Sequence, residues 1–332
     1  GNVQEVAQDG YFTGFITDSF QTELWFLVFA ALIFIIILGG VRNGVERMSK
    51  IMMPILVLLA IVVTIYSVTR PGALAGVKYF LIPNMKNFSF MTIVAAMGQM
   101  FYSLSIAMGI LYTYGSYTDK DMDLEQSTTQ IEIFDTGVAF LAGAMIIPAV
   151  FVFSGTEGMG AGPSLMFVSL PKVFAAMGKA GIFVGILFFV TAIFATLSSC
   201  ISVLESIVAN CMEIFHTGRK KTVSVLSAVY LAASAIIALG YSIFYVEVEL
   251  PNGSTGQLLD IMDYISNSVM MPFIALLSTI LIGWVMTPDY VIDEMERNGS
   301  RFRRKKLYRI MIRYVAPVMM FILFLQSTGV LS

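Results

Sequence analysis

Polar and acidic side chains interrupt the apolar runs of this 332-residue chain at four places. Serine, threonine and carboxylate oxygens are the ligands that hard cations prefer, and an ionisable group inside an apolar span marks a functional site by default. The four places are therefore candidate cation-binding positions: AAMGQMFYSLSIAMGILYTYGSY (95–117), Asp135 with Gln130 and Thr136, ATLSSCISVLESI (195–207), and Asp260 with Asp263 and Tyr264.

Each place also has a purely structural interpretation. The small residues of 95–117 permit either a helix break, which offers free carbonyl and N–H groups to ions, or an unbroken, closely packed helix. Asp135, at the start of its apolar block, is either interfacial or a buried ligand. The hydroxyls of 195–207 can bond to the preceding turn, whereas Glu205 is harder to explain without a function. The two outer aspartates suit a helix N-terminus or half of an outer gate.

The elements that carry these residues must cross a membrane. The chain is 57% hydrophobic and 13% charged, with a mean hydropathy of +0.82, which leaves too little polar surface for a soluble domain. Eight apolar blocks reach the length of about 20 residues that a spanning helix needs, and none alternates as a barrel strand does. The sequence predicts an all-α integral membrane protein with about eight transmembrane helices at 24–40, 51–68, 90–116, 132–154, 181–213, 222–245, 258–286 and 307–331.

Basic residues divide unevenly between the two faces of this bundle. Of the 20 lysines and arginines, all but Arg70, Lys78, Lys86, Lys172 and Lys179 fall on one face, which the positive-inside rule makes cytoplasmic. Both ends then lie outside. Because the chain begins there with Gly1, we expect an odd number of spans to be missing before it.

Motifs of other functional classes are absent from the sequence. It contains no nucleotide-binding loop, metalloprotease motif or hydrolase elbow, so we predict that it is not an enzyme. The run SRFRRKK (300–306) lies beside a span, where it sets orientation or touches anionic lipid; we predict no nucleic-acid partner.

Five ordered stretches resemble the neurotransmitter:sodium symporter family, which has the LeuT fold. GQMFYSLSIAMGILYTYGSY (98–117) resembles its sixth helix, IFDTGVAFLAGAMIIPAVF (133–151) its seventh, IFATLSSCISVLESIVA (193–209) its eighth, LLDIMDYISNS (258–268) its tenth, and GPSLMFVSLPKVF (162–174) its outer loop. The resemblance implies an N-terminally truncated LeuT-type inverted-repeat bundle. Residues 1–332 would form one transporter domain with family helices four to eleven, and loop 155–180 would cap the permeation path.

The resemblance also implies roles for individual residues. The first of two sodium sites would use Ser103 and Asp135, and the second the carbonyl of Ala195 with Ser198 and Ser199. The substrate would be bound by Tyr102, Ser103, Ser105, Met108, Ser202 and Val203. Asp263 would form the outer gate, and Gln99 would lie near the position where chloride-dependent members hold their anion. Gly44 and Pro54 would allow the inner gate to unwind.

Two residues depart from the family pattern. Ala107 stands where a glycine is common, which narrows the pocket, and Asp135 replaces the commoner asparagine. The fixed charge of Asp135 is hypothesised to replace chloride, which the intact protein would then not require. The apolar wall of Tyr102, Met108 and Val203 favours a hydrophobic or neutral L-amino acid.

The implied function is sodium-coupled symport by alternating access in the plasma membrane, as a multi-pass protein with cytoplasmic basic loops. Its partners would be a small-molecule amino-acid substrate and the lipid bilayer, and the sequence leaves the oligomeric state open. Because the family's first helix supplies half of the ligands, the chain alone is not expected to transport. The alternatives are a non-transporting membrane scaffold or truncated paralogue and, less favoured, a channel.

Overall fold

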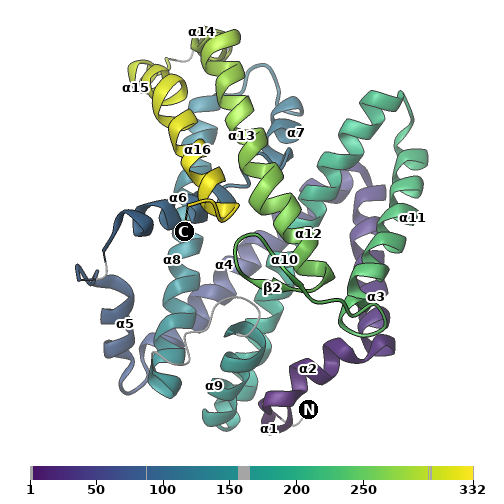
Figure 1. Cartoon of the computed structure of the whole chain (residues 1–332), viewed down its shortest axis with the longest axis vertical. Coiled ribbons are helices and arrows are strands. Elements are labelled where there is room, and N and C mark those ends of the chain that lie inside the picture. The colour runs from purple at the N-terminus through teal and green to yellow at the C-terminus, as the bar shows by residue number, and fades with distance from the viewer. Residues whose placement is uncertain (1–2, 87, 156–164, 298, 300, 332) are drawn as a thin grey trace. The chain divides into compact units, whose positions relative to one another are not determined.

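The computed structural model describes residues 3–86, 88–155, 165–297, 299 and 301–331, and these are almost entirely helical (Figure 1). Seven helices among the described residues are long and apolar enough to cross a membrane. They run over Ser19–Leu38, Val41–Val68, Leu124–Val152, Lys179–Phe215, Arg219–Tyr241, Leu258–Val285 and Lys305–Ser327. The third predicted span, 90–116, is divided into two shorter helices. The prediction of an all-α membrane protein is confirmed.

The chain forms two compact units, which are described separately. The first takes in residues 1–87, 136–204 and 211–243, and the second residues 88–135, 205–210 and 244–332. Two long helices contribute to both units, α8 (Leu124–Ser154) and α10 (Lys179–Phe215).

The first unit contains the N-terminal helices, the C-terminal part of α8 and most of α10. Its other helices are α1 (Val3–Val6), α2 (Asp9–Thr17), α3 (Ser19–Leu38), α4 (Arg47–Val68), α5 (Ala73–Leu81), α9 (Leu170–Ala176) and α11 (Arg219–Ala238). π-Helical turns at Val41–Glu46 and Leu165–Ser169 precede α4 and α9, and a 3₁₀ turn at Leu239–Tyr241 follows α11.

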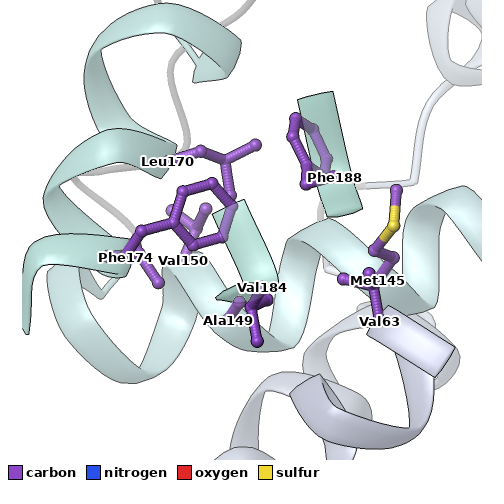
Figure 2. Close-up of a cluster of buried hydrophobic side chains, with 9 residues drawn as sticks. Val63, Met145, Ala149, Val150, Leu170, Phe174, Val184 and Phe188 are labelled. Carbon is purple, nitrogen blue, oxygen red and sulfur yellow. The ribbon is translucent and has the colours of Figure 1, made fainter. Parts of the chain in front are cut away.

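Buried apolar side chains from four helices hold the first unit together. Figure 2 shows Val63 of α4, Met145 and Val150 of α8, Leu170 of α9 and Phe188 of α10 in one cluster. Helices α3 and α11 pack side by side, and the guanidinium of Arg219 donates two hydrogen bonds, of 3.0 and 2.8 Å, to the carbonyl oxygen of Ile37. This arginine bonds to a carbonyl of the last turn of α3, where regular intrahelical partners run out.

The second unit contains the broken third span and the C-terminal helices. Its helices are α6 (Phe90–Ser103), α7 (Ile110–Ser116), α12 (Leu258–Asp263), α13 (Met271–Ile280), α14 (Pro288–Met295), α15 (Lys305–Ile310) and α16 (Ala316–Ser327), with π-helical turns at Tyr264–Met270, Leu281–Val285 and Met311–Val315. A short antiparallel hairpin pairs β1 (Val248–Glu249) with β2 (Thr255–Gly256).

Helices α13 and α16 lie against each other in the second unit, and α6 packs on α16 (Figure 1). The shared core consists of Phe101, Met271, Ala275, Met320 and Leu323. Two side-chain hydrogen bonds to backbone carbonyls connect the π-helical turn Tyr264–Met270 with the C-terminal end of α16. The Tyr264 hydroxyl donates to the Thr328 carbonyl at 3.1 Å, and the Ser327 hydroxyl donates to the Ser268 carbonyl at 2.6 Å. The end of α6 is thus held beside a fixed helix pair.

Candidate functional site

The third predicted span is a broken helix. Helix α6 ends at Ser103 and α7 begins at Ile110, and the connection contains three residues with positive φ: Ser105 at 53°, Ala107 at 65° and Gly109 at 79°. A helix cannot continue through such angles, so the structure decides for the break over the unbroken alternative. Carbonyl and N–H groups at the two new helix ends are then available to ligands.

The position of the break is explained by contacts on α10. A Cβ atom at Gly109 would lie 2.7 Å from the hydroxyl oxygen of Ser206, so both the angle and the space require glycine. The same Ser206 hydroxyl accepts a hydrogen bond of 3.1 Å from Thr113 on α7. These contacts hold the start of α7 against α10.

Ala107 is the residue of the break whose side chain is least suited to its backbone angle. We expect Ala107→Gly to change the unfolding free energy by less than about 1 kcal/mol, because relief of the left-handed strain offsets the lost methyl contact. Ala107→Val is expected to be at least about 2 kcal/mol less stable than the glycine variant, since a β-branched residue at positive φ is an outlier. Thermal unfolding in detergent measures both, and equal stabilities would contradict this description of the break.

Ser103 and Asp135 lie together, as a shared ligand site requires. The Ser103 hydroxyl donates a hydrogen bond of 2.7 Å to Asp135 Oδ1, and both side chains are half-buried in the second unit. Two oxygens this close can both face one ion when the hydroxyl hydrogen turns away. Asp135 lies near the start of its apolar block, but α8 begins earlier, at Leu124, where Asp123 accepts a 2.9 Å bond from the Gln126 N–H, so Asp135 lies three turns inside the helix.

In the first unit, Ser198 and Ser199 both direct their hydroxyls at the carbonyl of Ala195. The distances are 2.8 and 3.1 Å, which is the bonding to the preceding turn that the sequence allows. The Ser202 hydroxyl bonds in the same way to the Ser198 carbonyl at 3.0 Å, and Val203 is 37% exposed. The three oxygens of Ala195, Ser198 and Ser199 are therefore adjacent on one helix turn.

Glu205 is fully buried, which agrees with its expected depth, and its carboxylate lies in the second unit. It accepts a hydrogen bond of 3.0 Å from the Tyr117 hydroxyl, next to the Thr113–Ser206 pair. Glu205 is a candidate from the sequence, but its hydrogen bond with Tyr117 and the neighbouring Thr113–Ser206 pair were not predicted. The signal available was the spacing of Thr113 and Tyr117, four residues apart on one helix face.

The two outer aspartates have different partners. Asp260 accepts a 2.8 Å bond from the Gln257 N–H and so caps α12, in agreement with the structural interpretation. Asp263 is exposed, accepts a 2.5 Å bond from Asn267, and lines a cavity of about 280 Å³ together with Tyr102. The structure thus brings a predicted gate residue and a predicted substrate residue to one cavity of the second unit.

The other expected site residues lie apart from that cavity's described lining. Gln99 is exposed on α6, whereas Ser105 and Met108 are half-buried in the break. In the first unit, Gly44 is buried within the π-helical turn Val41–Glu46, and Pro54 lies inside α4. Loop 155–180 is described except for residues 156–164. Its described part contains the π-helical turn Leu165–Ser169, α9 and the first residues of α10.

Comparison with known proteins assigns the chain to a family. The model of the family described as "Sodium:neurotransmitter symporter family" matches residues 14–331. The uncharacterized sodium-dependent transporter YhdH of Bacillus subtilis is 34% identical over 100% of this chain and 73% of its own length. The uncharacterized sodium-dependent transporter MJ1319 of Methanocaldococcus jannaschii is 29% identical over 90% of this chain and 59% of its own length.

The fold has a close match among solved structures. The crystal structure of MhsT in complex with L-phenylalanine superposes with a TM-score of 0.82 at 33% identity, and the match covers 96% of this chain and 70% of MhsT. The LeuT-type fold and the transporter class are therefore confirmed, and the family is not an enzyme family. The chain belongs to the sodium:neurotransmitter symporter family.

Proposed function

We propose that the intact protein, meaning this chain with any segment encoded beside it, imports a hydrophobic or neutral L-amino acid with sodium by alternating access. Family membership supports sodium coupling, and the structural neighbour MhsT binds L-phenylalanine. The observation that carries the proposal is the 2.7 Å contact between Ser103 and Asp135 beside a broken helix. That geometry puts a carboxylate and a hydroxyl where free helix ends are available to an ion.

The proposed first sodium site consists of Ser103 and Asp135 with other oxygens of the intact protein. The proposed second site uses the Ala195 carbonyl and the Ser198 and Ser199 hydroxyls, which turn from the carbonyl toward the ion on binding. Sodium at either site orders the backbone that supplies its ligands. Substrate and sodium then raise each other's affinity by the same factor.

The proposed substrate residues fall on the broken helix and on α10. Tyr102, Ser103, Ser105 and Met108 offer polar groups beside an apolar wall, which suits an amino acid with an apolar side chain. Ser202 and Val203, on the part of α10 that belongs to the first unit, are proposed separately as substrate residues. The 280 Å³ cavity that holds Tyr102 and Asp263 supports an outer gate at Asp263 in the second unit.

The inner and outer ends have separate proposed roles. Gly44 and Pro54 would let the inner end of the second span unwind, since proline removes a helix hydrogen bond and glycine lowers the cost of leaving the helix. Loop 155–180 is proposed to cap the path from outside. The basic loops are proposed to face the cytoplasm of a plasma-membrane protein.

Uptake by proteoliposomes tests the proposal. Vesicles containing the intact protein are expected to accumulate tritiated leucine or phenylalanine when an inward sodium gradient is imposed, and not when potassium replaces sodium. Sodium-independent entry would indicate a channel. Absence of both uptake and binding, in protein that remains helical, would favour the scaffold.

Chloride dependence gives a separate prediction. Because Asp135 supplies a fixed negative charge near the first sodium site, replacement of chloride by gluconate is expected to leave uptake unchanged within about twofold. Asp135→Asn removes that charge and is expected to make the remaining uptake sensitive to chloride. A steep chloride requirement in the unmodified protein would contradict the role given to this carboxylate.

A further inference from the structure

A large basic cavity lies in the second unit, between the start of α8 and the segment that joins α14 to α15. It measures about 1490 Å³ and is open to the surface. Its described lining contains three acidic and six basic side chains, the latter being Arg301, Arg303, Arg304, Lys305, Lys306 and Arg309. Excess positive charge in a concave site attracts an anion.

Glu296 organises one wall of this cavity. Its carboxylate accepts a hydrogen bond from Lys305 and another, of 3.1 Å, from the Phe302 N–H. These two contacts hold the pKa of the Glu296 carboxyl below its usual value, so the group stays ionised near neutral pH. The Phe302 side chain is buried and packs edge-on against Tyr308 at 5.7 Å. The basic segment therefore has a defined backbone.

Helix α8 supplies the opposite wall. Glu125 accepts a hydrogen bond of 3.1 Å from the Arg303 N–H, and Glu132 pairs with Arg304 at 3.5 Å. Lys305 pairs with Glu296, and Arg309 with Asp289. Three of the six basic side chains thus have carboxylate partners.

The other three cations have a different environment. In the described part of the chain, the side chains of Arg301, Arg303 and Lys306 form no ion pair within 4.0 Å of a carboxylate, and all three are exposed at the cavity. Arg301 is near enough to Glu296 for its charge to contribute to the lowered pKa of that carboxyl. Three donors on one preorganised segment suit the oxygens of a phosphate group.

An apolar stripe continues from the cavity along the adjoining span. Leu307 lines the cavity and is 57% exposed, and the exposed side chains of Ile310, Met311 and Tyr314 follow on the same helix face. This helix, Lys305–Ser327, is one of the candidate membrane spans. A soluble phosphate would make no use of the stripe, whereas a phospholipid has both a phosphate and acyl chains.

We propose that this cavity binds the phosphate group of an anionic phospholipid, through Arg301, Arg303 and Lys306, with the acyl chains against Leu307, Ile310 and Tyr314. This is a specific lipid site and is independent of the proposed transport function. Bound lipid would join the start of α8 to the start of the last described span.

Native mass spectrometry of the purified protein tests the site. Unmodified protein is expected to retain phosphatidylglycerol through a titration in which phosphatidylcholine of the same chain length does not bind. The triple variant Arg301→Gln, Arg303→Gln, Lys306→Gln is expected to bind phosphatidylglycerol at least about tenfold more weakly, because each cation near an anionic surface contributes about fivefold. The charge-preserving variant Arg301→Lys, Arg303→Lys, Lys306→Arg is expected to stay within about threefold of the unmodified protein.

Matched controls distinguish binding at this site from general electrostatic attraction between the basic protein surface and anionic lipid. The variant Arg42→Gln, Lys220→Gln, Lys221→Gln removes three exposed cations elsewhere and is expected to keep full affinity. An equal loss in both triple variants would overturn the proposal. Competition by glycerol phosphate at the concentration of the lipid would also overturn it, by indicating a site for free phosphate. Gel filtration and helix content verify that each variant is folded. If the glutamine variant does not fold, weak binding of phosphatidylglycerol by the charge-preserving variant would contradict the proposed site.

Discussion

Asp135→Ala is expected to weaken the sodium dependence of amino-acid uptake by the intact protein severely. The carboxylate is half-buried and lies 2.7 Å from the Ser103 hydroxyl, and in the proposed sodium site its charge would offset the cost of removing water from the ion. Loss of one partner of a buried charge pair costs about 2–5 kcal/mol, so the sodium concentration for half-maximal uptake is expected to rise at least about thirtyfold. Ser103→Ala removes a neutral ligand and is expected to have a smaller effect.

Glu132→Ala provides the matched control for this prediction. Glu132 lies one turn earlier on α8 and is exposed, and among the residues that the structure describes its ion pair is the long surface contact with Arg304, which contributes about 1 kcal/mol or less. Its loss is expected to leave the sodium dependence of uptake within about twofold. If Asp135→Ala and Glu132→Ala change sodium dependence equally, the carboxylate of Asp135 is not a sodium ligand.

Gly44→Ala is expected to cause a large loss of stability in the first unit. A Cβ atom there would lie 1.9 Å from the Ile36 carbonyl oxygen, a backbone atom that no side-chain rotation can move. Overpacking of this kind costs about 3 kcal/mol or more, which corresponds to a fall in melting temperature on the order of 5–10 °C. A fluorescence-detected thermal shift in detergent measures it.

Gly137→Ala serves as the comparison for this substitution. Gly137 lies inside α8 with no atom within 4 Å of an added Cβ, and alanine favours the helix by about 1 kcal/mol. It is therefore expected to keep or slightly raise the melting temperature. A mild Gly44→Ala variant, no less stable than Gly137→Ala, would show that the turn Val41–Glu46 relaxes easily and does not need glycine.

Hydropathy predicts the number and approximate positions of the spans, but it does not predict where each helix begins and ends. Apolar blocks located every span, because lipid demands about 20 apolar residues in a row. The start of α8 was misplaced by eight residues, since the helix begins at Leu124 while the apolar block begins near 132. Polar residues that extend a helix into water leave no hydropathy signal, and only the cap at Asp123 marks the true start.

The break in the third span shows the limit of local sequence. Glycine and small polar residues at 98–109 are compatible with a packed helix as well as with a break. The contact of Gly109 with Ser206, nearly one hundred residues later, and the positive φ of Ala107 decide between them. Long-range contacts of this kind are not encoded in spacing along one segment.

The candidate site was predicted in its composition but not in all its contacts. Family resemblance identified Ser103 and Asp135, and the structure adds their hydrogen bond. The bond from Tyr117 to Glu205 was not predicted, because the two residues lie 88 positions apart in the chain. The basic run 300–306 was interpreted as an orientation signal or lipid contact, and its pairing with α8 through Glu125 and Glu132 was not visible in the sequence.

Equilibrium binding of radioactive sodium to the purified intact protein, with and without leucine, tests sodium coupling most directly. The proposed mechanism predicts that saturating leucine raises sodium affinity, and that sodium raises leucine affinity by the same factor, of about five or more. Sodium affinity that stays the same whether leucine is present or absent would contradict coupled symport through these oxygens.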